Sequence, residues 1–135
     1  MSLSRFRAPL ILSALILFVG VFAGGKLGLY AAIPYFDKVM HFSGGIAAAW
    51  LAWVFLRDDI APLQKWKQAL IVVSVAALIS VFWEFAEYAS NFTEHAFPWF
   101  YRYLHSGNLA DTITDLVCDL AGAFVFSAWA LRKRA

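Results

Sequence analysis

The sequence predicts an all-α fold, a polytopic membrane protein whose single domain, residues 1–135, is a bundle of four transmembrane helices. Composition is the first reason, because 62% of the residues are hydrophobic and only 15% are charged, against about 45–50% and about 25% in soluble domains. Spacing is the second reason, because each apolar stretch is close to the roughly 20 residues that a membrane helix needs. We place the four helices at about residues 9–31, 37–56, 66–89 and 110–131.

The first predicted helix follows Arg5 and Arg7, a pattern that a cleaved signal peptide also shows. Apolar residues continue as far as Phe36, interrupted only by Lys26, so we expect this helix to be retained. Three glycines recur on it at four-residue spacing, at Gly20, Gly24 and Gly28. Such a stripe lets another helix approach closely, and we expect that partner to lie within this chain.

The connections on the two sides of the predicted bundle differ in composition. Residues 58–62 (Asp-Asp-Ile-Ala-Pro) predict a short turn, with Pro62 in the first turn of the third helix. Residues 91–109 form a long connection that is rich in aromatic residues and holds Phe92, His95, Phe97, Trp99, Phe100, Tyr101, Arg102, Tyr103 and His105. We interpret it as an aromatic anchor in the outer membrane interface. A lid over a site beneath it is the alternative.

The basic residues predict the orientation of the bundle. Most of them fall at the end that holds both termini: Arg5, Arg7, Arg57, Lys65, Lys67, Arg132, Lys133 and Arg134. Lys26, Lys38 and Arg102 fall at the other end. Since positive residues concentrate on the cytoplasmic side of membrane proteins, both termini are predicted to be cytoplasmic.

Ionisable side chains gather at the outer end of three predicted helices. They are Asp37 and His41 at the start of the second helix, Glu84 and Glu87 at the end of the third, and Asp111, Asp115 and Asp119 at the start of the fourth. Spacings of three and four residues put the side chains of each helix on one face. Because successive helices cross in opposite directions, all these groups are expected in the outer half of the bilayer.

Six carboxylates in this zone cannot all stay ionised at low dielectric. A divalent cation, protonation of some acids, or a water-filled path for a cation would each relieve the repulsion. The predicted metal ligands are Asp37, His41, Glu84, Glu87, Asp115 and Asp119. Zinc takes nitrogen and oxygen ligands, whereas magnesium, manganese and calcium prefer oxygen. His41, Glu84 and Asp115 are the predicted catalytic residues, because ionisable groups within membrane spans are functional hypotheses by default.

Several of these residues also have structural interpretations. Asp111 follows Asn108 at the spacing of a capping pair, and Asp37 could cap the second helix. Glu87 could pair with a nearby cation. For the whole group, a buried polar network that fixes the register of the helices is the structural alternative.

Three motifs resemble those of the VanZ-like membrane proteins. Residues 37–42 (Asp-Lys-Val-Met-His-Phe) are similar to the signature Asp-Lys-x-x-His-Phe. The chain departs from VanZ-like sequences further along, at Asp119, where they often have Asn. Residues 83–87 (Trp-Glu-Phe-Ala-Glu) and 111–115 (Asp-Thr-Ile-Thr-Asp) look closer to a sister group of small, uncharacterised bacterial inner-membrane proteins. By motif, the resemblance carries over Asp37, Lys38, His41, Glu84, Asp115 and Gly122. It implies a multi-pass protein of the bacterial cytoplasmic (inner) membrane and, for VanZ-like proteins, a link to resistance to the glycopeptide teicoplanin.

These observations favour a metal-dependent or acid–base enzyme that acts on a lipid or lipid-linked cell-envelope precursor. One alternative is a protein that binds or transports a cation, a proton or an amphiphile, and four helices would then require a homo-oligomer. Another is a structural membrane scaffold. Nucleic acid is not an expected partner, because the basic residues sit in short clusters at helix ends. The single cysteine, Cys118, excludes an internal disulfide and a multi-cysteine metal site.

Overall fold

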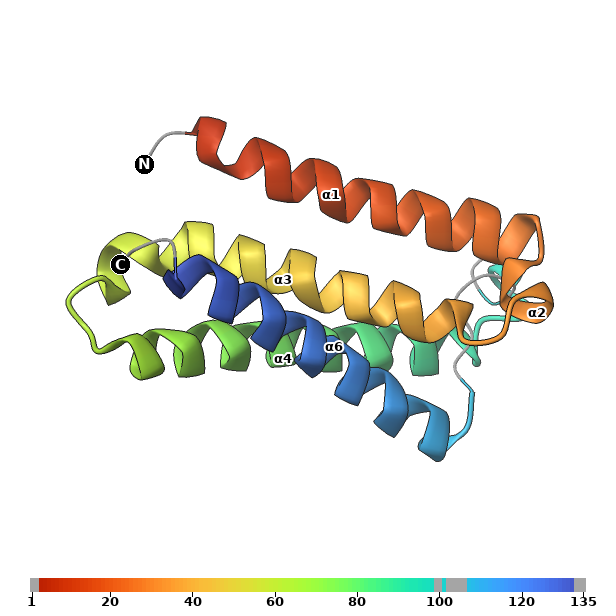
Figure 1. The fold of residues 1–135 in the computed structure, drawn as a ribbon. Helices are drawn as coiled ribbons and strands as arrows, with labels where there is room; N and C mark the ends of the chain where they lie inside the picture. The colour runs from red at the N-terminus through yellow and green to blue at the C-terminus, as the bar shows by residue number, and fades with distance from the viewer. Residues whose placement is uncertain (1–2, 99–100, 102–106, 133–135) are drawn as a thin grey trace.

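The computed structural model describes residues 3–98, 101 and 107–132, which form helices joined by short connections (Figure 1). A 3-10 turn, η1 (Leu3–Phe6), leads into α1 (Arg7–Phe18), which continues as the π-helical segment η2 (Val19–Lys26). The other helices are α2 (Leu29–Ala32), α3 (Phe36–Ile60), α4 (Lys65–Ser90) and α6 (Leu109–Arg132). Four stretches are long and apolar enough to cross a membrane: Ser4–Lys26, Phe36–Ile60, Lys65–Ser90 and Leu109–Arg132. The predicted all-α fold with four membrane spans is confirmed.

Two helix ends differ from the expected ones, for local reasons. The first long helix ends at Lys26, because Gly28 adopts a φ of 75°, a left-handed conformation that ends helices and that glycine adopts at little cost. The second continues past residue 56 to Ile60, so that Asp58 lies in the helix. Pro62 therefore lies in the turn before α4 and not in the first turn of that helix.

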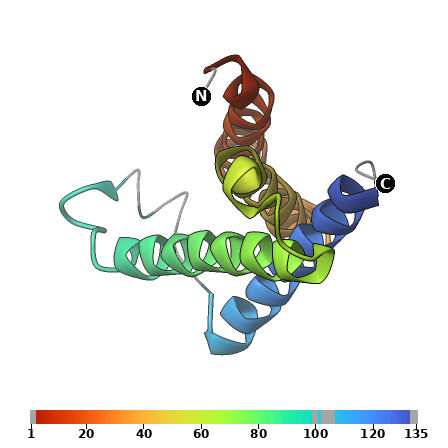
Figure 2. The same cartoon turned by 90° about the vertical axis from the view of Figure 1, so that its left-hand side faces the viewer.

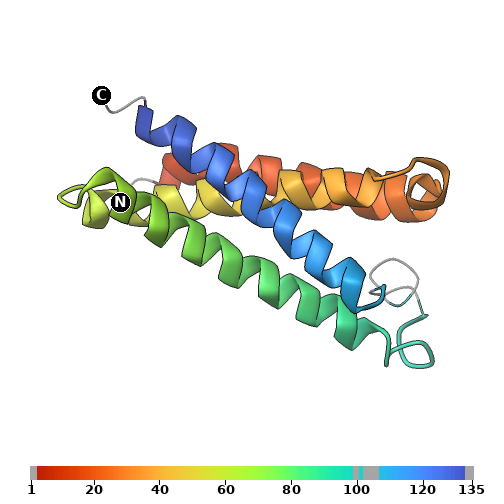
Figure 3. The same cartoon turned by 60° about the horizontal axis from the view of Figure 1, so that its bottom comes forward.

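Three of the long helices form the core. α3 contacts both α4 and α6, and α4 contacts α6. Figure 3 shows α6 running diagonally across the other two helices. Small side chains fill the core, including Ala49, Ala52, Ala76 and Ala123, each at most 3% exposed. Small residues let membrane helices approach closely where van der Waals packing drives their association.

Two glycines set the closest approach of α3 and α6. A Cβ atom at Gly45 would overlap the backbone carbonyl of Asp119, and one at Gly122 would overlap the backbone carbonyl of Phe42. The two helix backbones therefore touch at this crossing, which lies one helical turn beyond His41 on α3. This contact holds His41 close to Asp119.

The first helix lies apart from this core. Of the other long helices, α1 contacts only α3 in the described part of the chain, and Figure 2 shows it stacked over α3, away from α4. Its glycine stripe receives a side chain from α2: a Cβ at Gly24 would overlap the ring of Tyr30, and one at Gly20 would lie 3.1 Å from the Tyr30 hydroxyl oxygen. The partners lie within the chain, as expected: they are the Tyr30 ring of α2 and, at Gly20, Met40 of α3, whose Cε would lie 3.6 Å from a Cβ there.

The two ends of the bundle carry different elements. The chain begins and ends at one end of the bundle, and α2 and the segment after α4 lie at the other (Figure 1). Which end faces the cytoplasm stays a prediction. Much of the predicted aromatic loop, including Trp99, Phe100, Arg102, Tyr103 and His105, lies outside the described residues. Within the described part, Phe92 and Phe97 are exposed, as an aromatic anchor requires.

Candidate functional site

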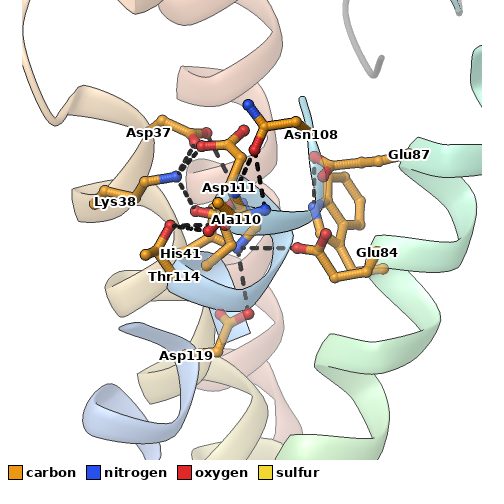
Figure 4. A network of polar contacts seen from close by, with 12 residues as sticks. Asp37, Lys38, His41, Glu84, Glu87, Asn108, Ala110, Asp111, Thr114 and Asp119 are labelled. Carbon is orange, nitrogen blue, oxygen red and sulfur yellow. Dashed lines mark hydrogen bonds and ion pairs between the residues drawn. The ribbon is translucent and has the colours of Figure 1, made fainter. Parts of the chain in front are cut away.

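Three helices bring ionisable side chains together in one network of polar contacts (Figure 4). α3 contributes Asp37, Lys38 and His41, α4 contributes Glu84, and α6 contributes Asp111, Asp115 and Asp119. Four-residue spacing along α3 and α6 keeps each set on one helix face. His41, Glu84, Asp115 and Asp119 are all buried, with 3–7% of each residue exposed. Acidic residues are seldom this buried unless they are paired. The partners of each carboxylate therefore indicate whether it has a structural or a functional role.

We define the lysine cluster as Lys38, Asp37, Asp111 and Asp115. The Lys38 ammonium donates hydrogen bonds to all three carboxylates, with Nζ 3.1 Å from Asp37 Oδ2, 2.5 Å from Asp111 Oδ1 and 2.6 Å from Asp115 Oδ1. An ammonium group has three donors, so Lys38 is fully satisfied. Each carboxylate of this cluster therefore has a cationic partner from the protein itself.

We define the histidine cluster as His41, Glu84 and Asp119. His41 Nδ1 lies 3.2 Å from Asp119 Oδ2, within hydrogen-bonding distance, and 3.8 Å from Glu84 Oε1. Both oxygens of Glu84 are buried, and neither accepts a hydrogen bond from the described residues. Thr112 lies near this carboxylate but outside hydrogen-bonding geometry. Because an unbonded buried charge is costly, Glu84 is the group that an added ligand would stabilise most.

His41 links the two clusters. Its second ring nitrogen, Nε2, lies 3.8 Å from Asp37 Oδ1 and 3.8 Å from Asp115 Oδ1. The imidazole ring thus has Asp119 and Glu84 on its Nδ1 side and the lysine cluster on its Nε2 side. Carboxylates near one ring nitrogen commonly orient a histidine whose other nitrogen binds a metal.

Each side of the imidazole ring offers three donor groups to a metal ion. The groups are Asp37, His41 and Asp115 on one side and His41, Glu84 and Asp119 on the other, with donor atoms within 4.8 Å of one another. Ligand atoms about 2.0–2.2 Å from a tetrahedral metal lie about 3.3–3.6 Å apart. The 3.2 and 3.8 Å separations in the histidine cluster are close to this range. On the other side, the charge of Lys38 would repel a metal, so the histidine cluster is the better candidate.

The predicted capping roles fall to other residues. Asn108, and not Asp111, caps α6: its Oδ1 accepts hydrogen bonds from the backbone N–H groups of Ala110 and Asp111 at 2.9 and 3.1 Å. α3 has no side-chain cap at its first turn, and Asp37 bonds to Lys38 instead. The carboxylates of both aspartates therefore belong to the lysine cluster.

Glu87, a predicted metal ligand, lies outside both groups of candidate ligands. Its Oε1 accepts a hydrogen bond from Trp83 Nε1 at 2.9 Å, and Tyr30 lines the same cavity as these two side chains. Sequence reasoning missed both aromatic residues. The four-residue spacing of Trp83 and Glu87 could have indicated their contact. Tyr30 reaches the site only through the turn at Gly28, for which the sequence offers no strong signal.

Four membrane-crossing helices around a buried, largely acidic site define a multi-pass integral membrane protein. The chain belongs to the family described as predicted membrane protein (DUF2238), which matches residues 2–135. It is 29% identical over 132 residues to an uncharacterized protein of Thermotoga maritima, and the match covers 95% of this chain. The chain spans 64% of the length of that relative. No solved structure matches the chain. The resemblance to VanZ-like proteins stays a prediction.

Proposed function

We propose that this protein is a metal-dependent enzyme of the bacterial cytoplasmic membrane that acts on a lipid or lipid-linked cell-envelope precursor at the outer leaflet. His41, Glu84 and Asp119 bind a divalent cation, and the lysine cluster holds His41 in place. The observation that carries the proposal is Glu84, a buried carboxylate whose two oxygens accept no hydrogen bond from the described residues. It lies 3.8 Å from a histidine nitrogen that also contacts a second carboxylate.

A purely structural network is the less favoured interpretation. A network that only fixes helix packing is most stable when every buried polar group is satisfied, and the lysine cluster fits that description. The histidine cluster does not, because Glu84 and Asp119 bring two acidic groups to one histidine. A divalent cation would offset both charges. It would also bind the oxygens of Glu84, which accept no hydrogen bond from the described residues.

The ligand set also suits chemistry at a lipid headgroup. Three protein ligands leave a position for water or substrate, as in catalytic zinc sites. A metal bound there would lower the pKa of its bound water and polarise a phosphoryl or carbonyl oxygen. In this proposal Asp115 is a positioning residue that acts on His41 through the lysine cluster.

The depth of the site is compatible with a headgroup substrate. His41 is five residues after Phe36, where α3 begins, which corresponds to about 8 Å at 1.5 Å per residue. The predicted orientation places this end of the helices at the outer leaflet. A lipid headgroup would therefore reach the site by moving only a little more than one helical turn below the membrane interface.

Metal content and metal-dependent turnover in one preparation test the proposal. Protein purified in mild detergent and incubated with Zn²⁺, Mn²⁺, Mg²⁺ or Ca²⁺ is expected to retain about one equivalent of one of them, measured by inductively coupled plasma mass spectrometry. In vesicles of bacterial lipid extract, it is expected to alter a lipid headgroup in a chelator-sensitive manner, followed by lipid mass spectrometry. Glu84→Gln should lose both properties, whereas Glu87→Gln should retain the metal. Wild-type protein with less than about a tenth of an equivalent of any metal would contradict the proposal.

A further inference from the structure

A cavity of about 280 Å³ opens beside the histidine cluster, between α1, α3 and α4. Within the described residues α1 does not contact α4, and Figure 2 shows the ribbon of α1 over α3 and apart from that of α4. Its α3 lining runs from Asp37 to Leu51, fourteen residues or about 21 Å at 1.5 Å per residue. A cavity of this volume and length is long and narrow, a shape that suits a linear chain.

Most of the cavity wall is hydrocarbon. Ile16 and Leu17 of α1, Ala47 and Leu51 of α3 and Ile79 of α4 line it. Leu17 and Ile79 are 48% and 42% exposed, so the described residues leave a large part of both side chains uncovered. The occupant of this part of the cavity must therefore be apolar, because a polar group here would lose its hydrogen bonds to water.

The end of the cavity nearest α2 is polar and acidic. Its lining there includes Asp37, His41, Glu87 and Asp119, and among the described residues no lysine or arginine lines the cavity. Lys38 points into the lysine cluster, where its three donors are already used. Lys38 and His41 already pair with Asp37 and Asp119, whereas Glu87 forms no ion pair with a described residue. This end therefore still favours a positively charged group on the occupant.

Two aromatic residues accompany these carboxylates. Trp83 is held by its hydrogen bond to Glu87, and Tyr30 is held by the packing of its ring against Gly24. Burial, together with the charges of Asp37 and Glu87, raises the pKa of Tyr30 to about 12, so its phenol stays neutral at physiological pH. Aromatic rings beside carboxylates form a favourable environment for an ammonium ion, because the ring faces and the carboxylates both attract positive charge.

We propose that the cavity binds a membrane lipid with a primary ammonium headgroup. One hydrocarbon chain lies between α1, α3 and α4, and the ammonium group lies at Asp37 and Glu87, between the Tyr30 and Trp83 rings. This places the rest of the headgroup beside the histidine cluster. The lipid is the substrate of the proposed enzyme, and in that respect the inference rests on the proposed function, although binding itself does not require the metal.

Binding of lysophosphatidylethanolamine to the full chain in detergent, measured by native mass spectrometry, tests this inference. We expect it to bind about tenfold or more tightly than lysophosphatidylglycerol of the same chain length, a factor typical of one added ionic contact. Glu87→Gln should reduce this preference for lysophosphatidylethanolamine, while both lipids still bind through their hydrocarbon chains. Equal binding of the two lipids to the wild-type protein would overturn the inference.

Filling the cavity provides a matched pair of variants. Ile79→Trp places a large ring in the cavity and is expected to weaken lipid binding at least about tenfold. Leu78→Trp changes a neighbouring residue that is 55% exposed and does not line the cavity, so it should leave binding unchanged. Leu17→Trp blocks the opposite wall and should act as Ile79→Trp does. Undiminished binding in both blocking variants would also overturn the inference.

Glu84→Gln separates this inference from the proposed function. Glu84 does not line the cavity, so this variant should lose the metal and still bind the lipid. If the wild-type protein binds the ammonium lipid selectively but no metal, the inference stands and the proposed enzyme is wrong. If it binds metal and turns over lipid without selectivity for the ammonium headgroup, the proposed enzyme stands and this inference is wrong.

Discussion

The lysine cluster and the histidine cluster lie about one helical turn apart along α3 and α6, with Glu84 of α4 added in the histidine cluster, yet their charges are balanced differently. In the lysine cluster, one ammonium group lies within 3.1 Å of three carboxylates. In the histidine cluster, two carboxylates share one imidazole nitrogen, and Glu84 lies 3.8 Å from it without a hydrogen bond. The contrast shows that a concentration of acids does not by itself define a functional site. The informative residue is Glu84, the acid whose two oxygens accept no hydrogen bond from the described residues.

Access to water strengthens the contrast. In the lysine cluster, the side chains of Asp37 and Asp111 are 36% and 38% exposed, so water can solvate part of their charge, whereas Asp115 is 4% exposed and depends on Lys38. In the histidine cluster, the side chains of Glu84 and Asp119 are 5% and 6% exposed. Because screening by solvent weakens with burial, charge in the histidine cluster has to be offset by protein groups or by a bound ion.

Removing the ammonium group of Lys38 is expected to have the largest effect on stability. Lys38→Met deprives Asp115 of its partner at 2.6 Å and leaves three carboxylates together. Removing one member of a buried ion pair costs about 3–5 kcal/mol, and we expect about 3 kcal/mol because the Lys38 side chain is 23% exposed. Thermal unfolding in detergent measures the change. Lys65→Met, at an exposed position at the start of α4, is the control, and an equal shift in the two variants would show that the lysine cluster is not structural.

The crossing of α3 and α6 supports both clusters, so disturbing it should affect both. In Gly45→Ala the new methyl group would overlap the backbone carbonyl of Asp119, and the helices must separate. Overpacking of this kind costs about 1–3 kcal/mol, and the movement of Asp119 away from His41 should also weaken metal binding. The measurements are thermal unfolding and metal titration.

The neighbouring glycine provides the control for this prediction. A Cβ at Gly44 would lie 3.5 Å from Asp119 Oδ1, an ordinary contact distance. Gly44→Ala should therefore be neutral or stabilising by up to about 1 kcal/mol, because alanine has the higher helix propensity. Equal losses of stability in Gly44→Ala and Gly45→Ala would mean that close backbone approach does not position the site.

Much of the fold could be predicted from the sequence, because membrane spans leave a strong signal. Length and hydropathy locate all four spans, since a bilayer requires about 20 apolar residues per helix. Local departures were harder to foresee. The break at Gly28 depends on a backbone conformation that most glycines do not adopt in a helical context, and it places Tyr30 against Gly20 and Gly24 of η2. The continuation of α3 through Asp58 could not be foreseen, because residues 58–62 have a composition typical of a turn although α3 extends to Ile60.

The site was predictable as a set of residues but not as a set of contacts. Spacing places Asp115 and Asp119 on one face of α6, and alternating helix direction places that face at the depth of His41. Spacing cannot say which carboxylate meets which cation, because that depends on the rotation and crossing of α3 and α6. For this reason Lys38, known only as a neighbouring cation, proves to bridge three acids, and Glu84 proves to have no hydrogen bond among the described residues.

The smallest expected effect on stability, and the sharpest test of the contrast, comes from Glu84→Gln. Without metal, the amide removes a buried charge that accepts no hydrogen bond from the described residues, so the variant should be as stable as the wild-type protein or up to about 1 kcal/mol more stable. With a divalent cation at about 100 times its Kd, the free energy of unfolding of the wild-type protein should rise by about 2.7 kcal/mol, and that of Glu84→Gln should rise little.

The control is Glu87→Gln, one turn further along α4 and outside both groups of candidate ligands. It should be stabilised by the metal as much as the wild-type protein is. Thermal unfolding with chelator and with added metal measures all three proteins. Equal stabilisation of wild type and Glu84→Gln by metal would place the cation elsewhere, and the two clusters would then differ in burial but not in function.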